Sequence, residues 1–522
     1  MATKRRTGTR PNILLLFTDM QRFDTIRALG NPVIKTPNLD RLCENGVAFT
    51  NAFSPSPVCV SARCSMIYGQ YPHRTGCYGN ERMPVDDRRT FMGALTDAGY
   101  RTHGVGKCHF TPDGNALRGF QTRERQTEGG GRSLENFPYL QLLLDKGYRH
   151  VCEVHGVRGE MYYVPQVSQL PAELHPSQWI ADRSMAFLHE QAKGGAPWYL
   201  FSSFIHPHPP FTPPTPWHKL YRPTLMPQPN VPQDVESLQT YVNLMQNRYK
   251  YRDQGLDFNL IRAMKAYYYA CISFVDFQVG RILQALEETK QLDNTLVLFT
   301  SDHGEHLGDY NCFGKRSMHD SCARVPFIVS QPGRFEGGKR CDAPVSLVDV
   351  APTFLAAAGT ALGTHESDGV DLAQVVGGTA DRKAVFSQCA EVWLRPETLP
   401  GVDLKDPVAL RALMSQYMAV SREWKYVYSA PDGKEFLFDR VRDPLETRNR
   451  ASVQFCRHAK GEMQKVLIQF LRQGGETAGL DGEGWRLFPK CEAPADPDAW
   501  LLIQDGYTPW TDTRIPGYTD AS

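Results

Sequence analysis

The feature that most constrains the fold of this chain is a recurring alternation of short apolar runs with longer amphipathic stretches. Each apolar run has the length of one buried strand. The stretch "NLIRAMKAYYYACISFVDFQVGRILQALEETK" at 259–290 shows the periodicity of a helix. Strands that alternate with helices predict an α/β fold, with a mostly parallel sheet between two layers of helices. The predicted strands are 12–17, 101–105, 198–204, 295–299 and 325–329.

The chain has 522 residues, which is too long for one hydrophobic core. After residue 375 the pattern changes. "YMAVSREWKYVYSAPDGKEFLFD" predicts an antiparallel hairpin with its turn at 431–433, and "QFCRHAKGEMQKVLIQFLRQ" predicts an amphipathic helix. We therefore predict a large α/β domain over 1–375, a smaller α+β domain over 376–490 and a C-terminal arm over 491–522. Whether this arm joins copies of the chain into a homo-oligomer is left open.

Charge and hydropathy exclude some partners. Lys plus Arg number 58 and Asp plus Glu 57, so the net charge of +1 gives no basis for binding nucleic acid. No stretch approaches the ~20 apolar residues of a membrane span, and the apolar run at 13–17 is too short for a signal peptide. Thirteen cysteines, an odd number without a secretion signal, predict reduced thiols and a cytoplasmic location.

Polar side chains follow four of the predicted strands. Ligands of open α/β sheets bind at the carboxyl ends of the strands, so these side chains are candidates for one shared site. Any one of these side chains could serve as a helix cap, a turn residue or a solvated surface group. That explanation becomes weaker because polar side chains recur at four strand ends. Two carboxylates and a histidine suit a metal ion, and the lysines and other histidines suit an anion. The residues are Asp19, Lys107, His109, His206, Asp302, His303 and Lys315.

The segment "SPVCVSARCSMIYGQYPHRTG" at 56–76 resembles the signature of type I sulfatases in the alkaline-phosphatase-like superfamily. The family pattern is Cys-x-Pro-Ser-Arg, three residues, then Leu-Thr-Gly. Here Cys59 and Arg63 keep this spacing, and Gly69 ends it. "GKCHF", His206, "SDHGEHLGD" and Lys315 match further family motifs in the expected order, and the resemblance spans roughly residues 10 to 450.

This resemblance implies an alkaline-phosphatase-like fold and hydrolysis of a small-molecule sulfate monoester. It also implies that a formylglycine-generating enzyme oxidises Cys59 to Cα-formylglycine, whose hydrated gem-diol is the nucleophile. The implied metal ligands are Asp19, Asp302, His303 and the modified Cys59. Ca²⁺ is the expected ion, and Mn²⁺ stays open because His303 supplies a nitrogen ligand.

The resemblance further assigns roles to the cationic and histidine side chains. Arg63, Lys107 and Lys315 would hold the charge of the transferred group. His206, with Lys315, would protonate the leaving oxygen, and His109 would take the gem-diol proton that expels sulfate. The chain departs from the family pattern in three places: Ser61 replaces the motif proline, Met20 the second aspartate, and His303 an asparagine.

Two other functions compete with sulfate ester hydrolysis. A phosphodiesterase or phosphonate monoester hydrolase uses the same scaffold, and "GCYGN" and the Asp302-His303 pair resemble that branch. Lys107 and His109 favour a sulfatase, because sulfate esters are poorer metal ligands than phosphates and need more cationic donors. A binding protein without catalysis would have kept the nucleophile, metal and cation positions without using them.

Overall fold

The computed structural model describes residues 10–128, 138–158, 161–245, 257–380, 382–396 and 398–492. Its main unit is an eight-stranded sheet with the strand order β5-β4-β6-β1-β7-β8-β2-β9. Neighbouring strands are parallel except that β8 runs antiparallel to both β7 and β2. The strands are β1 (Asn12–Thr18), β2 (Val47–Phe49), β4 (Arg101–Gly106), β5 (Thr122–Arg125), β6 (Trp198–Ser203), β7 (Thr295–Ser301), β8 (Phe327–Ser330) and β9 (Lys339–Cys341). The predicted α/β class with a mostly parallel sheet is therefore confirmed.

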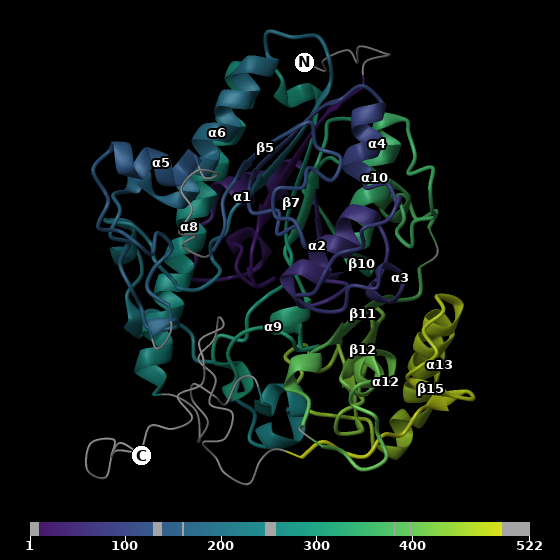
Figure 1. Ribbon diagram of the computed structural model, residues 1–522. Helices are drawn as coiled ribbons and strands as arrows, with labels where there is room; N and C mark the ends of the chain where they lie inside the picture. Colours follow the sequence, from purple (N-terminus) through teal and green to yellow (C-terminus); the bar gives the residue numbers. More distant parts are fainter. Residues whose placement is uncertain are drawn as a thin grey trace.

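Helices cover both faces of this sheet (Figure 1). Successive side chains of a strand point to opposite faces. Accordingly Leu14 and Leu16 of β1 pack in the core beneath α1 (Pro37–Asn45), α6 (Pro176–Gln191) and α8 (Phe258–Glu288). Ile13 and Leu15 pack in the core beneath α2 (Cys59–Tyr68), α4 (Phe91–Asp97) and α10 (Val350–Ala358). Of the described helices, none has the length and apolar character needed to cross a membrane.

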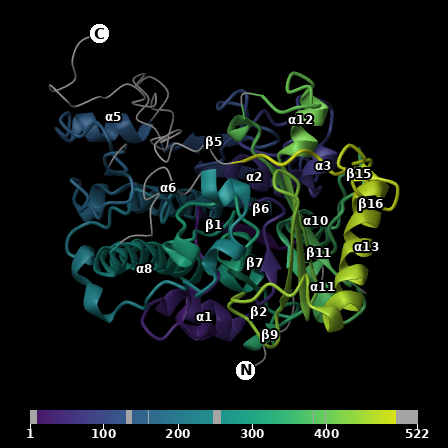
Figure 2. The ribbon, with the colours of Figure 1, turned by 90° about the horizontal axis from the view of Figure 1, so that it is seen from below.

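A separate four-stranded antiparallel sheet forms the C-terminal part of the described chain (Figure 2). It contains β11 (Val385–Ala390), β12 (Ser415–Val420), β13 (Trp424–Ser429) and β14 (Lys434–Asp439). The predicted hairpin is confirmed, because β13 and β14 pair from Trp424 with Asp439 to Ser429 with Lys434. The predicted amphipathic helix is α13 (Arg457–Gln473), which packs on this sheet through Leu467. The domain limits at 375 and 490 stay predictions. Of the predicted arm over 491–522, all but its first two residues lie outside the part of the chain that the structure describes.

Buried ion pairs join α9 (Asp320–Ala323), at the end of the loop that follows β7, to the C-terminal sheet. The Asp320 carboxylate accepts hydrogen bonds from Lys425 Nζ at 2.8 Å and from Arg440 Nη1 at 3.1 Å. Lys425 lies on β13 and is fully buried. Because a buried charge needs a partner, these contacts fix the end of the loop that follows β7, which carries Asp302, His303 and Lys315.

Candidate active site

The carboxyl ends of β4, β1 and β7 bring three of the predicted polar side chains to one edge of the sheet. Lys107 follows β4, Asp19 follows β1 and Asp302 follows β7. These strands are parallel, so they end on the same side. Lys107 Nζ lies 2.5 Å from Asp19 Oδ2. All three side chains are buried, so their charges interact strongly with one another.

Cys59 is the first residue of α2, and its thiol lies among these groups. The extended backbone of Val58 starts the helix at this point. Cys59 Sγ lies 3.2 Å from His303 Nε2 and 3.8 Å from Asp19 Oδ1. Lys315 Nζ donates a hydrogen bond to Cys59 Sγ at 2.6 Å. The structure thus brings the predicted nucleophile position against a metal-type ligand and a cation.

Arg63 lies one turn further along α2, and its guanidinium is used to hold the carboxylates. Nε donates to Asp302 Oδ2 at 2.9 Å, and Nη2 donates to Asp19 Oδ2 at 3.0 Å. Nη1 donates to the Lys107 carbonyl at 2.5 Å and to Ser203 Oγ at 3.0 Å. Each guanidinium nitrogen thus has a protein acceptor, so Arg63 holds the two carboxylates in place, and its predicted role in binding the transferred group stays a prediction.

Asp19, Cys59, Asp302 and His303 form a buried donor cluster, in which one ligand atom from each lies within 4.8 Å of the others. His303 Nδ1 is 2.9 Å from the Gly304 carbonyl. That contact makes Nδ1 the protonated nitrogen and directs the lone pair of Nε2 into the cluster. Asp302 Oδ1 accepts from the backbone amides of Met20 and His303. Two oriented carboxylates and an imidazole nitrogen fit a divalent cation, and they are the residues that the sequence predicts.

The charges of the site favour a negative group at position 59. Burial would raise the pKa of the Cys59 thiol, but Lys107, Lys315 and His303 hold it well below its ordinary value. Burial and Cys59 would likewise raise the pKa of Asp19, yet Lys107 and other nearby cations lower it. Burial and the charge of Asp19 raise the pKa of Asp302 to about 6. An oxyanion formed at residue 59 would be stabilised by the same cations.

His109 lies against Cys59 and has a strained backbone. Its φ of 56° falls in the left-handed region, which non-glycine residues adopt rarely and often at functional sites. Burial and the charge of Lys107 lower the pKa of His109, whereas the neighbouring Cys59 opposes this shift. A neutral imidazole in contact with residue 59 can accept a proton from it.

His206 and His208 occupy different positions, although both belong to the run "HPHPPF" after β6. His206 Nδ1 is 3.4 Å from Ser177 Oγ, and its Nε2 is 3.1 Å from Thr212 Oγ1. His208 Nε2 is instead 3.4 Å from Lys315 Nζ, and a nitrogen of its ring lies within 4.8 Å of Cys59 Sγ. His208 therefore lies beside Cys59, and the sequence interpretation missed it. The hydrogen bonds of His206 to Ser177 and Thr212 direct its ring toward those residues instead.

Glu128 is a second residue that the motifs did not identify. It follows β5, the edge strand, and its carboxylate forms an ion pair with Lys107. The same carboxylate lies 3.5 Å from His208 Nε2 and 3.7 Å from Arg158 Nη2. One ligand atom each from Glu128, His208, Asp19 and Cys59 lie within 4.8 Å of one another. An acidic side chain thus reaches the anion-binding groups of the site.

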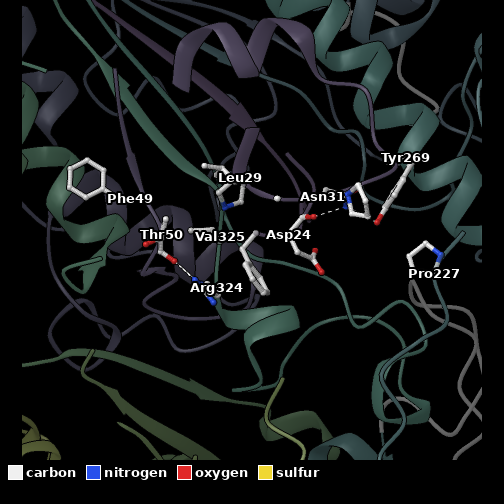
Figure 3. A pocket seen from close by; sticks show the side chains of 13 residues that line it. Asp24, Leu29, Asn31, Phe49, Thr50, Pro227, Tyr269, Arg324 and Val325 are labelled. Atoms are coloured by element: carbon white, nitrogen blue, oxygen red, sulfur yellow. Dashed lines mark hydrogen bonds between the residues drawn. The ribbon is translucent and has the colours of Figure 1, made fainter. Parts of the chain in front are cut away.

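A cavity of about 350 Å³ lies apart from this cluster, between the loop after β1 and α8 (Figure 3). Its polar lining groups are bonded to protein. Asn31 Nδ2 donates to Tyr269 Oη at 2.9 Å, and Arg324 Nε donates to the Thr50 carbonyl at 2.8 Å. Asp24 is paired with Arg22. We assign no chemistry to this cavity.

Comparison with known proteins agrees with this geometry. The sulfatase family profile matches residues 11–360. An arylsulfatase of Clostridium perfringens is 28% identical over 497 residues, which is 91% of this chain and 96% of that protein. A choline-sulfatase of Rhizobium meliloti is 30% identical over 464 residues, covering 85% of this chain and 83% of that protein. The solved phosphonate monoester hydrolase of Agrobacterium radiobacter superimposes with a TM-score of 0.75 and 25% identity, covering 93% of this chain and all of that one.

The fold and the buried cluster define a hydrolase with an alkaline-phosphatase-like architecture. More specifically, the chain belongs to the sulfatase family and is a sulfatase. The resemblance seen in the sequence is confirmed.

Proposed function

We propose that this sulfatase cleaves a sulfate monoester with residue 59 as the nucleophile, after conversion of Cys59 to Cα-formylglycine by a separate maturation enzyme. The observation that carries the proposal is the contact of Cys59 Sγ with both His303 and Lys315. It joins the nucleophile position to a cation-binding donor cluster on one side and to a positive charge on the other.

Asp19, Asp302, His303 and the converted residue 59 would hold one divalent cation, with Ca²⁺ the first candidate and Mn²⁺ the alternative. When bound, this ion supplies a Lewis acid that favours the deprotonated nucleophile and polarises the ester oxygens. Arg63 keeps the Asp19 and Asp302 carboxylates in place through its two ion pairs. The hydrated aldehyde supplies two hydroxyl groups, of which one attacks sulfur and the other releases sulfate.

Lys107 and Lys315 would hold the negative oxygens of the sulfuryl group. Both are buried beside residue 59, where their charges are little screened by solvent. The positive charges of the two lysines should contribute more to sulfate binding than the geometry of their hydrogen bonds. The sulfuryl oxygens carry negative charge throughout the reaction, and this charge is attracted to both lysines at every stage.

His109 and His208 would move protons on opposite sides of the transferred group. His109 would accept the proton whose loss from residue 59 expels sulfate. On the leaving-group side, Lys315 Nζ, which carries protons, lies 3.4 Å from His208 Nε2. Burial and the charge of Lys315 lower the pKa of His208 to about 4. We therefore infer that the pair acts together, with Lys315 as the source of the proton for the leaving oxygen.

A comparison of ester classes tests this function. The matured, metal-loaded protein should hydrolyse a nitrophenyl sulfate with a kcat/KM above that for a nitrophenyl phosphodiester or phenylphosphonate monoester. Lys107→Met should lower the sulfate rate more than the phosphodiester rate, because the metal holds phosphate oxygens better than sulfate oxygens. A higher kcat/KM for the phosphorus ester would contradict the proposal. It would instead favour phosphonate or phosphodiester hydrolysis, to which the solved structural neighbour draws attention.

Substituting each histidine of the "HPHPPF" run separates their roles. We expect His208→Asn to reduce kcat for an alkyl sulfate by up to ~10²–10⁴-fold, the usual effect of losing proton transfer, because Lys315 then lacks the imidazole with which it acts. The loss should be much smaller for a nitrophenyl sulfate, because its phenolate leaves without a proton.

His206→Asn is the matched control two residues away. Since His206 bonds to Ser177 and Thr212, any loss of rate in this variant should be similar for both esters. Measured kcat values for the two esters in both variants decide the assignment. If His206→Asn shows the leaving-group dependence and His208→Asn does not, the leaving-group role returns to His206.

A further inference from the structure

Glu128 places a negative charge where the sulfatase must bind an anion. Its carboxylate contacts Lys107 and His208, the two groups assigned above to the sulfuryl and leaving oxygens. The side chain is 17% exposed, so its charge is only partly screened by solvent. A carboxylate in this position repels an incoming sulfate ester, so its presence in the site needs an explanation.

The partners of Glu128 do not need it to keep their places. Lys107 Nζ is held by Asp19 Oδ2 at 2.5 Å. His208 Nδ1 is 2.8 Å from the Pro209 carbonyl, which fixes its ring. Arg158 Nη2 donates to the Glu128 main-chain carbonyl at 3.2 Å, so this contact survives loss of the side-chain charge. Glu128 is therefore poorly suited to be a positioning residue for Lys107 or His208.

We propose that Glu128 is an internal occupant of the anion site, whose carboxylate pairs with Lys107 in the free enzyme and gives up this cation when a sulfate group binds. This inference rests on the proposed function, because it takes Lys107 as a sulfate ligand. The carboxylate then weakens binding of the substrate and of the sulfate product alike. It shortens the time for which product sulfate blocks the site, at the expense of substrate affinity.

Binding of inorganic sulfate to the metal-loaded protein tests the inference without turnover. Isothermal titration should give Glu128→Gln a Kd for sulfate roughly tenfold or more below that of the wild type, because a competing, partly buried charge has been removed. KM for an aryl sulfate should fall in parallel, and kcat should not rise. Glu128→Ala should show the same direction, which separates the effect of charge from that of the amide.

Glu124→Gln is the matched control on β5, since Glu124 pairs with Arg183 and His103 rather than with the site. It should bind sulfate as the wild type does. Unchanged or weaker sulfate binding in both Glu128 variants overturns the inference and makes Glu128 a support for Lys107. Failure of the proposed function has a different signature, in which the wild-type protein itself binds no sulfate.

Discussion

Cys59→Ala should lose sulfatase turnover by roughly 10⁴-fold or more, the scale seen when an enzyme loses its nucleophile. The thiol lies within 3.2 Å of His303 Nε2 and 2.6 Å of Lys315 Nζ. No other described side chain is equally placed to attack an ester held by Lys107 and Lys315. The rate for a nitrophenyl sulfate in wild-type and variant protein, both matured with a formylglycine-generating enzyme, measures the effect.

Peptide mass spectrometry of the wild type should show the chemical change directly. Conversion of the thiol side chain to an aldehyde lowers the mass of the Cys59 peptide by about 18 Da. Ser61 stands where the family motif has proline, so the converted fraction is itself informative. The activity of a preparation should scale with this fraction. Activity that is independent of it would assign the chemistry to another group.

Cys64→Ala is the matched control for this experiment. Cys64 lies on α2 as Cys59 does and is equally buried, but it belongs to the apolar core on that side of the sheet. This variant should keep its turnover, with at most a modest loss of stability from the smaller side chain. Comparable inactivation of both variants would indicate that distortion of α2, and not loss of the nucleophile, caused the effect at Cys59.

Periodicity predicted the central strands well, because they are buried on both faces and read as continuous apolar runs. The run 12–17 forms β1 (Asn12–Thr18), and 295–299 forms β7 (Thr295–Ser301). Periodicity could not predict whether β8 runs parallel or antiparallel to β7. The chain returns from β7 to β8 through a loop without crossing the sheet, which makes this pair antiparallel. The three-residue strand β2 was also missed, because so short a segment carries no period.

The site was predicted where a motif fixes both the residue and its place in the fold. Cys59, Asp302, His303 and Lys315 belong to such motifs, and the structure brings them together. His208 was missed because two histidines in "HPHPPF" carry the same local signal, and only their packing separates them. Glu128 was missed because its contact with Lys107 joins the ends of β5 and β4, a pairing that no local pattern records.

Asp302→Asn should remove most of the bound metal and lower kcat by about 10²-fold or more. Asp302 is fully buried, and its Oδ1 is oriented by two backbone amides. An amide nitrogen cannot accept these hydrogen bonds or bind a cation, and an amide oxygen binds a cation without the charge of a carboxylate. Metal analysis of the purified variant, followed by titration with Ca²⁺ or Mn²⁺ while the rate is measured, tests the expectation and identifies the ion.

Asp276→Asn controls for loss of a buried carboxylate elsewhere. Asp276 is 1% exposed on α8 and accepts hydrogen bonds from Asn38 and Leu39, outside the donor cluster. This variant should retain its metal. In Asp302→Asn, Arg63 loses a charged partner but keeps Asp19, so the fold should survive and the metal should not. A full metal content in Asp302→Asn together with wild-type kcat would show that the cation lies elsewhere. Metal retained with a large loss of kcat would instead mean that Asp302 acts on the reacting groups and not as a ligand.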